Sequence, residues 1–279
     1  MSDIIVFING KFIPLKNGKV SFRDAAFQFG DGIFETIRFE NRKLFLVQKH
    51  INRLKKSLNI LDLDLNKTDS EIKKILNEVI RANKLNSGLL RLMITRGNID
   101  GKPWDYKGEA GIYVSIRNID KIESNKVKVL FYNESNYPII RFNPAIKSMN
   151  YMGNMKAKKD AKNQGAYEPI FYNKDGLITE CAIRNIFFIK EKTLITPSLD
   201  LGVLPGIMRN TIIEIAKNLN IKVEETLIPF ELVNDMDEAF ISSTGVGLLP
   251  CYWDNWESNY QLTNTLLKKL NKLIDNSCK

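Results

Sequence analysis

Three parts of the sequence have residue types that could bind a phosphate or another anion. The first, Pro205–Arg209, opens a helical pattern whose first amide N–H groups would point outward at the positive end of the helix dipole. The second, Ser243-Thr244-Gly245, follows a predicted strand and offers hydroxyl and amide donors. The third is Arg53, three residues after His50 on a predicted helix. Each alone also fits an ordinary helix start, turn or surface arginine, so an anion site is favoured only if other parts of such a site accompany them.

The single histidine and the three cysteines limit the chemistry that the chain can perform. With only His50, the sequence excludes a histidine-based catalytic triad and a metal site built from several histidines. The cysteines, Cys181, Cys251 and Cys278, are odd in number and widely spaced, which fits neither a disulfide scaffold nor a zinc site. We therefore expect no metal, and a reducing, cytoplasmic compartment.

Composition and charge leave more than one class of protein open. Hydrophobic residues make up 44% of the 279 residues, which is enough apolar surface for a buried core. The 41 Lys and Arg against 32 Asp and Glu give a net charge of +9, which could attract nucleic acid, membranes or anionic substrates. The lysines are scattered, however, and the least charged stretch, residues 241–253, is shorter than the ~18 residues of a membrane span. We expect neither a nucleic-acid nor a membrane partner, and a basic nucleic-acid-binding protein is the alternative class.

Hydrophobic periodicity predicts a small α/β domain over residues 1–117. A hairpin is expected at the start, where Asn9-Gly10 separates two short apolar runs. The pattern alternates every second residue in the other predicted strands and every three to four residues in the predicted helices. The further strands are expected at 34–39, 43–47, 89–95 and 111–116, and the helices at 48–61 and 69–84.

The polar, aperiodic segment 118–125 is the expected interdomain linker, and a larger domain is expected over residues 126–279. A single large domain is the alternative. The chain is therefore predicted to have a mixed α/β fold. Strands of the second domain are expected at 127–132, 168–172, 186–189, 193–196, 222–227 and 238–242, and helices at 150–163, 206–219 and 262–274.

Seven short motifs, in order and at compatible spacing, resemble those of one enzyme family. They are Phe29-Gly30-Asp31-Gly32-Ile33-Phe34-Glu35, His50-x-x-Arg53-Leu54, Thr95-Arg96-Gly97, Lys147-Ser148-Met149-Asn150-Tyr151, Thr179-Glu180-Cys181 with Asn185-Ile186-Phe187, Leu204-Pro205-Gly206-Ile207-Met208-Arg209, and Ser243-Thr244 before Pro250. The chain resembles the class IV enzymes that use pyridoxal 5'-phosphate, namely branched-chain and D-amino-acid aminotransferases and aminodeoxychorismate lyase. The resemblance implies the two-domain fold type IV, with the cofactor in the cleft, and a homodimer.

The resemblance also implies the roles of three residues at the cofactor ring. Lys147 would be the catalytic residue, which holds pyridoxal 5'-phosphate as a Schiff base and then moves the α-proton of the substrate. This chemistry needs a neutral amine, and hence a lysine that is desolvated or close to other cations. Glu180 matches the carboxylate that keeps the pyridine nitrogen protonated, so that the ring accepts electrons. Tyr151 matches the phenol that hydrogen-bonds the ring oxygen.

The same resemblance would explain why several anion-binding features occur in one chain. It implies that they bind the phosphate of the cofactor together. The residues expected at the phosphate are Arg53, Gly206, Ile207, Met208, Ser243 and Thr244.

The substrate site is implied by further matches. Arg96 matches the carboxylate-binding arginine of D-amino-acid aminotransferases and an arginine of the lyase, whereas Arg91 aligns with an arginine of the branched-chain enzymes. Arg38 points from a strand near the cleft in this family. We expect all three, together with Phe29 and Gly245, at the substrate.

Three departures from the family pattern bear on the substrate. Phe29 stands where branched-chain enzymes often have tyrosine, Gly247 stands where many aminotransferases have glutamate, and the sequence also departs from the usual pattern at Arg184. The expected activity is transfer of an amino group between a branched-chain or small amino acid and 2-oxoglutarate. The alternative is 4-amino-4-deoxychorismate lyase, which eliminates pyruvate to give 4-aminobenzoate.

Overall fold

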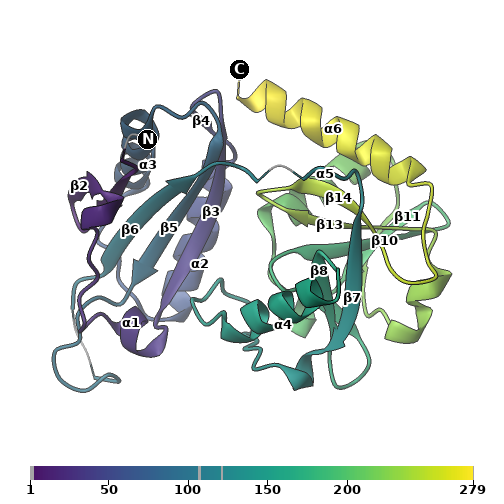
Figure 1. Ribbon diagram of the computed structural model, residues 1–279, viewed down its shortest axis with the longest axis horizontal. Coiled ribbons are helices and arrows are strands. Elements are labelled where there is room, and N and C mark those ends of the chain that lie inside the picture. Colours follow the sequence, from purple (N-terminus) through teal and green to yellow (C-terminus); the bar gives the residue numbers. More distant parts are fainter. Residues whose placement is uncertain (1–2, 106–107, 121, 279) are drawn as a thin grey trace. The chain divides into compact units, whose positions relative to one another are not determined.

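The computed structural model describes residues 3–105, 108–120 and 122–278. The chain divides into two compact units, each with its own β-sheet (Figure 1). Unit 1 comprises residues 1–120, 146–150 and 274–279, and unit 2 comprises residues 121–145 and 151–273. The expected linker, 118–125, includes residue 121, which lies outside the described residues, and the expected domain boundaries stay a prediction.

Unit 1 contains a six-stranded antiparallel sheet in the order β2-β1-β6-β5-β3-β4. Two long helices pack on it, since α2 contacts β3 while α3 contacts β1 and β6. The strands are β1 (Ile5–Ile8), β2 (Lys11–Pro14), β3 (Gly32–Glu40), β4 (Lys43–Leu44), β5 (Gly88–Thr95) and β6 (Gly111–Arg117), and the helices are η1 (Leu15–Asn17), α1 (Ala25–Phe29), α2 (Val47–Ile60) and α3 (Asp69–Asn83).

Both long helices of unit 1 follow from their apolar stripes. Ile51, Leu54 and Leu58 are buried on one face of α2, as their spacing of three to four residues predicts. Helix α3 begins with a capping box, in which the Thr68 hydroxyl accepts from the Glu71 amide and the Glu71 carboxylate accepts from the Thr68 amide. The start of α3 is therefore encoded locally.

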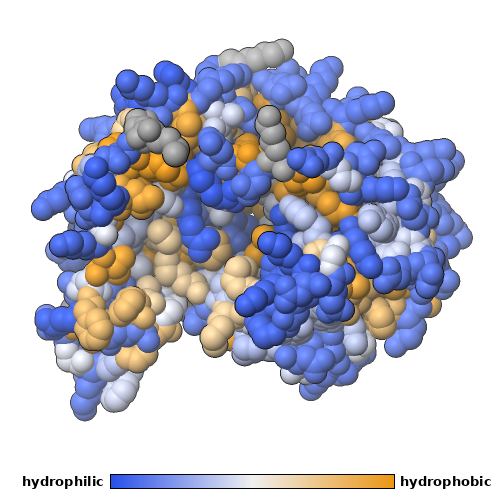
Figure 2. Space-filling view, viewed as in Figure 1, coloured by the Kyte–Doolittle hydropathy of each residue, from blue (hydrophilic) through white to orange (hydrophobic). Residues whose placement is uncertain are grey.

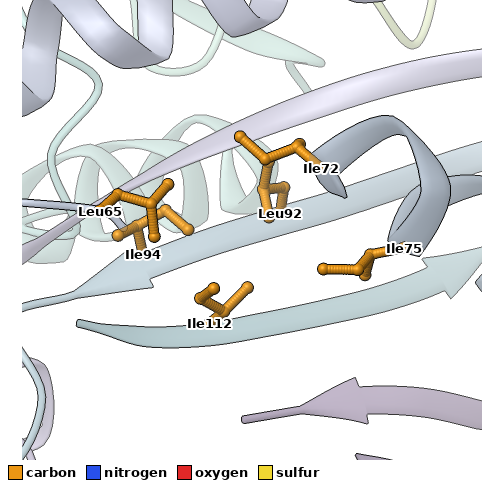
Figure 3. A pocket seen from close by; sticks show the side chains of 6 residues that line it. All are labelled: Leu65, Ile72, Ile75, Leu92, Ile94 and Ile112. Atoms are coloured by element: carbon orange, nitrogen blue, oxygen red, sulfur yellow. The ribbon is translucent and has the colours of Figure 1, made fainter. Parts of the chain in front are cut away.

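A small apolar hollow lies where α3 covers the sheet of unit 1 (Figure 3). Its lining side chains are all aliphatic, and they come from α3, β5, β6 and the segment before α3. A site for a polar ligand needs a few placed polar groups, so we assign this hollow to packing. The lining residues are Leu65, Ile72, Ile75, Leu92, Ile94 and Ile112.

Unit 2 contains an eight-stranded mixed sheet in the order β12-β11-β10-β13-β14-β7-β8-β9. The pairs β11–β12, β14–β7 and β7–β8 are parallel, and the others are antiparallel. The strands are β7 (Val127–Asn133), β8 (Glu168–Tyr172), β9 (Ile178–Cys181), β10 (Asn185–Lys190), β11 (Thr193–Pro197), β12 (Val223–Thr226), β13 (Glu238–Ser243) and β14 (Gly247–Tyr252).

The core of unit 2 is formed by buried side chains of these strands, including Ile170, Phe188 and Ile241. Helix α4 packs against β7 and β8, and α5 packs against β12 and β13. The helices after residue 126 are η2 (Glu134–Asn136), α4 (Met152–Asn163), η3 (Leu199–Leu201), α5 (Ile207–Asn218), η4 (Phe230–Asp235) and α6 (Gln261–Ser277).

Most predicted elements are confirmed to within a few residues, and the differences are local. The predicted strand 43–47 is wrong beyond Leu44, because the backbone turns at Leu46 with a positive φ of 51° and α2 begins at Val47. Helix α1 and strands β9 and β14 were not predicted.

Hydrophilic residues cover most of the visible surface of each unit, and apolar residues gather in smaller areas between them (Figure 2). This distribution agrees with the scattered lysines of the sequence. Within residues 3–105, 108–120 and 122–278, none of the helices is long and apolar enough to cross a membrane.

Candidate active site

Lys147 belongs to a short segment of unit 1 that runs beside the first half of β3. The Phe34 amide donates to the Lys147 carbonyl at 2.9 Å, and the Met149 amide donates to the Gly32 carbonyl at 2.9 Å. Strand β4 pairs with Phe39 and Glu40 at the other end of β3, so the edge of β3 at Gly32 and Phe34 can pair with the segment that contains Lys147. The backbone of Lys147 is therefore held by a sheet strand.

The side chain of Lys147 lies against an aromatic ring that it shares with an arginine. The Lys147 amine is 4.4 Å from the centre of the Phe34 ring, and the Arg91 guanidinium carbon is 3.8 Å from the same centre. Arg91 lies on β5 opposite Thr36, and alternate residues of a strand share a face, so Phe34, Thr36 and Arg91 project from one face of the sheet. Lys147 is half-buried there.

Two glycines of the Phe29–Glu35 motif allow the lysine segment to approach. Gly30 has a positive φ of 69°, and a Cβ atom at this position would collide with the Asn150 side chain. A Cβ on Gly32 would be 2.8 Å from the Ile94 carbonyl oxygen and 2.9 Å from the Met149 sulfur. Gly30 is needed for its positive φ and for the room that the Asn150 side chain takes, and Gly32 for the close approach of the Ile94 carbonyl and the Met149 side chain.

Arg53 is oriented by a buried carboxylate, Glu35, on β3. Arg53 Nε donates to Glu35 Oε1 at 2.8 Å and Arg53 Nη2 donates to Glu35 Oε2 at 2.6 Å, while His50 Nδ1 is 2.7 Å from Oε2. Burial alone would raise the pKa of Glu35, but the charge of Arg53 and the hydrogen bonds from His50 and Arg53 lower it to about 2. Burial lowers the pKa of His50, so the imidazole is neutral at pH 7 and donates through Nδ1.

Arg38 lies near the end of β3, and Phe29 ends the short helix before that strand. Arg38 projects from the same face of β3 as Phe34, and its Nη2 is 2.6 Å from Glu40 Oε1. Phe29 is the last residue of α1, and its side chain is 55% exposed. Phe29 therefore takes no part in the core of unit 1.

Arg96, the other candidate for a substrate carboxylate, is bound within unit 1. Its Nε is 2.5 Å from Asp31 Oδ2, and its Nη2 and Nη1 donate to the carbonyls of Leu61 and Asp62 at 2.8 and 3.2 Å. The guanidinium thus joins the motif at the start of β3 to the residues that follow α2.

In unit 2, Glu180 on β9 lies in a polar cluster that sequence reasoning did not find. One oxygen, Oε1, forms an ion pair with Arg141 Nη1. Arg141 Nη2 is also 2.8 Å from Glu134 Oε2. The other Glu180 oxygen accepts longer hydrogen bonds, at 3.3 Å from the Leu204 amide and 3.5 Å from Asn185 Nδ2. No local sequence pattern predicts this cluster, because Glu134 and Glu180 are 7 and 39 residues from Arg141.

Asn185 connects Glu180 to the start of α5. Its Nδ2 also donates to the Leu204 carbonyl at 3.0 Å, and a Cβ atom on Gly206 would collide with its Oδ1. Gly206 is the N-cap of α5 and has no side chain with which to cap the amides of Ile207 and Met208. The expected phosphate-binding helix start and the expected ring-binding carboxylate are therefore fixed to one another.

The remaining expected residues of unit 2 lie at a turn and at a helix start. Ser243 is the last residue of β13 and pairs with Gly247 of β14, so Thr244 and Gly245 form the turn between them. Ser243 Oγ accepts from the Val246 amide at 3.4 Å. Tyr151 is the half-buried N-cap residue of α4.

The expected site residues therefore fall into two groups, one in each unit. The group in unit 1 is Phe29, Arg38, Arg53, Arg91, Arg96 and Lys147, and the group in unit 2 is Tyr151, Glu180, Gly206, Ile207, Met208, Ser243, Thr244 and Gly245.

Arg184, a departure from the family pattern, has a structural partner. It forms an ion pair with the fully buried Glu168, which also binds Lys158 Nζ at 2.6 Å, and Arg184 Nη2 donates to the Tyr167 hydroxyl at 2.6 Å. A buried carboxylate needs such partners, so Arg184 serves the packing of β8.

Comparisons with known proteins agree on one family. The model of amino-transferase class IV matches residues 32–252. A D-alanine aminotransferase from Listeria monocytogenes is 32% identical over 250 residues, which cover 88% of this chain and 86% of the relative. An aminodeoxychorismate lyase from Bacillus subtilis is 29% identical over 252 residues, which cover 88% of this chain and 85% of the relative.

The fold leads to the same family. The solved structure of a branched-chain aminotransferase from Thermoproteus uzoniensis with norvaline has a TM-score of 0.87 and 25% sequence identity, and the match covers 99% of this chain and 96% of that one. This likeness confirms the expected fold type IV. Class IV aminotransferases depend in general on pyridoxal 5'-phosphate and act on amino acids and oxo acids. This chain is an enzyme that belongs to the class IV aminotransferase family.

Proposed function

We propose that the chain is an aminotransferase that uses pyridoxal 5'-phosphate to move an amino group between a branched-chain or small amino acid and 2-oxoglutarate. The observation that carries the proposal is the position of Lys147, which matches the catalytic lysine of the family and lies with Arg91 against Phe34. The bound cofactor supplies an electron sink for the carbanion at the α-carbon of the substrate.

The donor groups of the two units suit the chemical parts of this cofactor. The helix start at Ile207 and Met208 and the hydroxyls of Ser243 and Thr244 offer hydrogen bonds to a phosphate. Glu180 offers a carboxylate to a ring N–H, and Lys147 offers a primary amine to an aldehyde. Each group has a chemically matched partner on the cofactor.

In the proposed reaction the residues of the chain bind and orient the cofactor, and one of them moves a proton. Lys147 would hold the cofactor through its amine, and, once the amino group of the substrate has displaced that amine, Lys147 would move the proton at the α-carbon. Arg53, oriented by Glu35, binds the phosphate, and Glu180 keeps a proton on the ring nitrogen.

We further propose that Arg91 binds the substrate carboxylate and that Arg96 does not. The support is position: Arg91 lies against the same ring as the Lys147 amine, whereas Arg96 joins Asp31 to the backbone carbonyls of Leu61 and Asp62. Because Arg91 aligns with an arginine of branched-chain enzymes, this choice supports a substrate of that kind.

The test is Lys147→Ala, assayed for glutamate formed from 2-oxoglutarate with L-leucine or with D-alanine. We expect turnover to fall by at least about a thousandfold, because no other amine can replace the covalent link. Lys156→Ala, which changes an exposed lysine of α4, is the matched control and should keep full activity. Normal turnover and normal visible absorption of Lys147→Ala would refute the assignment.

Aminodeoxychorismate lyase is the second candidate, supported by the similarity to the Bacillus subtilis relative and by Thr179-Glu180-Cys181, which resembles the lyase. The purified enzyme should be given aminodeoxychorismate in a separate assay. Formation of pyruvate and 4-aminobenzoate, without glutamate from the amino-acid assay, would favour the lyase. Arg91→Ala then separates the carboxylate assignments, because we expect a higher KM for the amino acid only if Arg91 binds it.

We also propose a homodimer whose active site includes residues of the neighbouring chain, in a reducing, cytoplasmic compartment. The resemblance to the family supports the dimer. Three free, buried cysteines, Cys181, Cys251 and Cys278, support the compartment. Light scattering measures the oligomeric state, and a fully active monomer would contradict the dimer.

A further inference from the structure

Glu180 shares a single guanidinium with a second carboxylate of unit 2. Arg141 pairs with Glu180 through Nη1 and with Glu134 through Nη2, and the three side chains are only 16–19% exposed. The Arg141 guanidinium is also 3.0 Å from the Thr179 hydroxyl, which is neutral. We call Glu134, Arg141 and Glu180 the Glu180 cluster.

With all three groups ionised, the Glu180 cluster has a net charge of −1. Burial alone would lower the pKa of Arg141, but the charges of Glu180 and Glu134 raise it, so the guanidinium stays protonated. A pair of Arg141 and Glu180 without Glu134 would be neutral. Glu134 therefore offsets the charge of Arg141 and leaves the charge of Glu180 uncompensated.

An uncompensated charge in a largely buried site is unfavourable unless a ligand brings the opposite charge. Among the residues that the structure describes, the side of Glu180 away from Arg141 accepts only the hydrogen bonds of 3.3 and 3.5 Å from Leu204 and Asn185. These bonds are longer than a charge-assisted hydrogen bond, which is typically about 2.7–2.9 Å. A ligand with a cationic N–H group would complete the charge balance.

We propose that Glu134 and Arg141 are positioning residues that set the protonation of the pyridine ring: Arg141 fixes the Glu180 carboxylate, and Glu134 cancels the charge of Arg141. The proposal rests on the proposed function and adds to it two residues that act through Glu180. A purely structural role of the cluster would affect every ligand of the site equally. A role in charge balance affects only a ligand with a ring nitrogen.

The test compares the binding of two ligands to the protein after its cofactor has been removed. They are pyridoxal 5'-phosphate and its 1-deaza analogue, in which a C–H group replaces the ring nitrogen. The wild-type protein should bind the natural cofactor more tightly, because only this ligand can donate a charged N–H to Glu180. The quantity compared is the dissociation constant of the analogue divided by that of the natural cofactor. This ratio reports on the ring nitrogen alone, because the two ligands have the same phosphate and aldehyde.

Glu134→Gln keeps the shape of the side chain and removes its charge. We expect the ratio to fall by about three- to tenfold, since a nearby unit charge shifts a proton affinity by roughly that factor or more. Glu224→Gln is the matched control, because it removes the same charge from an exposed ion pair with Lys222 in unit 2. Its ratio should equal that of the wild type.

The double variant Glu134→Gln/Arg141→Gln removes one charge of each sign. The net charge of the cluster returns to −1, so the ratio should recover toward the wild-type value. If the cluster had only a structural role, the double variant should instead lower the ratio below that of Glu134→Gln. If Glu134→Gln alone does not fold, the ratio of the double variant is compared with that of Glu180→Gln, which shows the ratio expected when the acceptor charge is absent.

The outcomes separate the inference from the proposed function. Failure of the wild-type protein to bind either ligand would refute the proposed function. A wild-type preference for the natural cofactor that Glu134→Gln leaves unchanged, or that the double variant does not recover, would overturn the charge balance and leave the proposed function intact.

Discussion

Each unit has a largely buried cluster in which an arginine pairs with glutamate, and the two clusters differ in charge balance. In unit 1 the Glu35 cluster joins one carboxylate, Glu35, to Arg53 and to a neutral histidine, His50, so its charges cancel. In unit 2 the Glu180 cluster joins two carboxylates to Arg141 and has a net negative charge.

The comparison shows how the same residue types can serve opposite purposes. Both oxygens of Glu35 accept short hydrogen bonds from its own cluster, and its side chain is only 2% exposed, so Glu35 orients an arginine. Glu180 is 16% exposed, and the hydrogen bonds that one of its oxygens accepts within the described part of the chain are long, at 3.3 and 3.5 Å. The balanced cluster is closed, whereas the unbalanced cluster is suited to accept a cation.

The largest effect is expected from removing the charge of Glu35, which balances that of Arg53 in unit 1. Glu35→Gln should lower the free energy of unfolding at pH 7 by about 3 kcal/mol, because it leaves Arg53 without its carboxylate. The pKa of Glu35 falls from its usual 4.5 to about 2 on folding, so its stabilisation is complete above pH 4.5 and is lost as the pH falls toward 2. Urea denaturation at pH 7 and pH 3 should therefore show a smaller difference between wild type and variant at pH 3. An equal difference at both pH values would contradict the assignment.

The next effect concerns the acceptor charge in unit 2. Glu180→Gln should lower kcat by about a hundredfold or more at saturating cofactor, because an amide does not keep the ring nitrogen protonated. The visible absorption of the bound cofactor should remain, since Lys147 is unchanged. Turnover equal to that of the wild type would exclude Glu180 from this role.

Smaller effects are expected from removing a charged or a neutral side chain that binds the phosphate. Arg53→Ala should weaken cofactor binding by roughly ten- to a hundredfold, because a charge-assisted hydrogen bond is worth about 1.5–3 kcal/mol. Thr244→Ala, the neutral counterpart, should weaken binding only about two- to tenfold. Equilibrium dialysis measures both, and excess cofactor should restore turnover. The interpretation fails if Arg53→Ala binds the cofactor normally or cannot be rescued.

The fold could be predicted from the sequence wherever a single periodicity runs through an element. Helices α2, α3, α5 and α6 and most strands have such patterns. Strand β14 was missed because Pro250 lies inside it and proline rarely occurs within a sheet. Proline fits there because β7 pairs with Cys251 and Tyr252, and Pro250 lies outside that ladder. Helix α1 is only five residues long, although its cap residues, Asp24 and Gly30, could have revealed it.

The candidate site was predictable only where a residue has a local motif. Lys147, Glu180 and Arg53 were recognised through such motifs, but Glu134 and Arg141 were not. Their contacts join segments that only tertiary folding brings together, and a lone glutamate or arginine is ordinary in any sequence. The choice between Arg91 and Arg96 also needed the structure, because each matches an arginine of a different branch of the family and only the structure places Arg91 beside the Lys147 amine.

The segment 146–150 has a consequence for how the chain can be cut. Unit 1 takes this segment from beyond residue 120, and the Gly32 carbonyl and the Phe34 amide bind it. A fragment ending at residue 120 would therefore expose part of an apolar strand edge, which is a template for intermolecular pairing and aggregation. Unit 1 is thus built from non-contiguous segments of the chain, and we expect a fragment of residues 1–120 expressed alone to be insoluble.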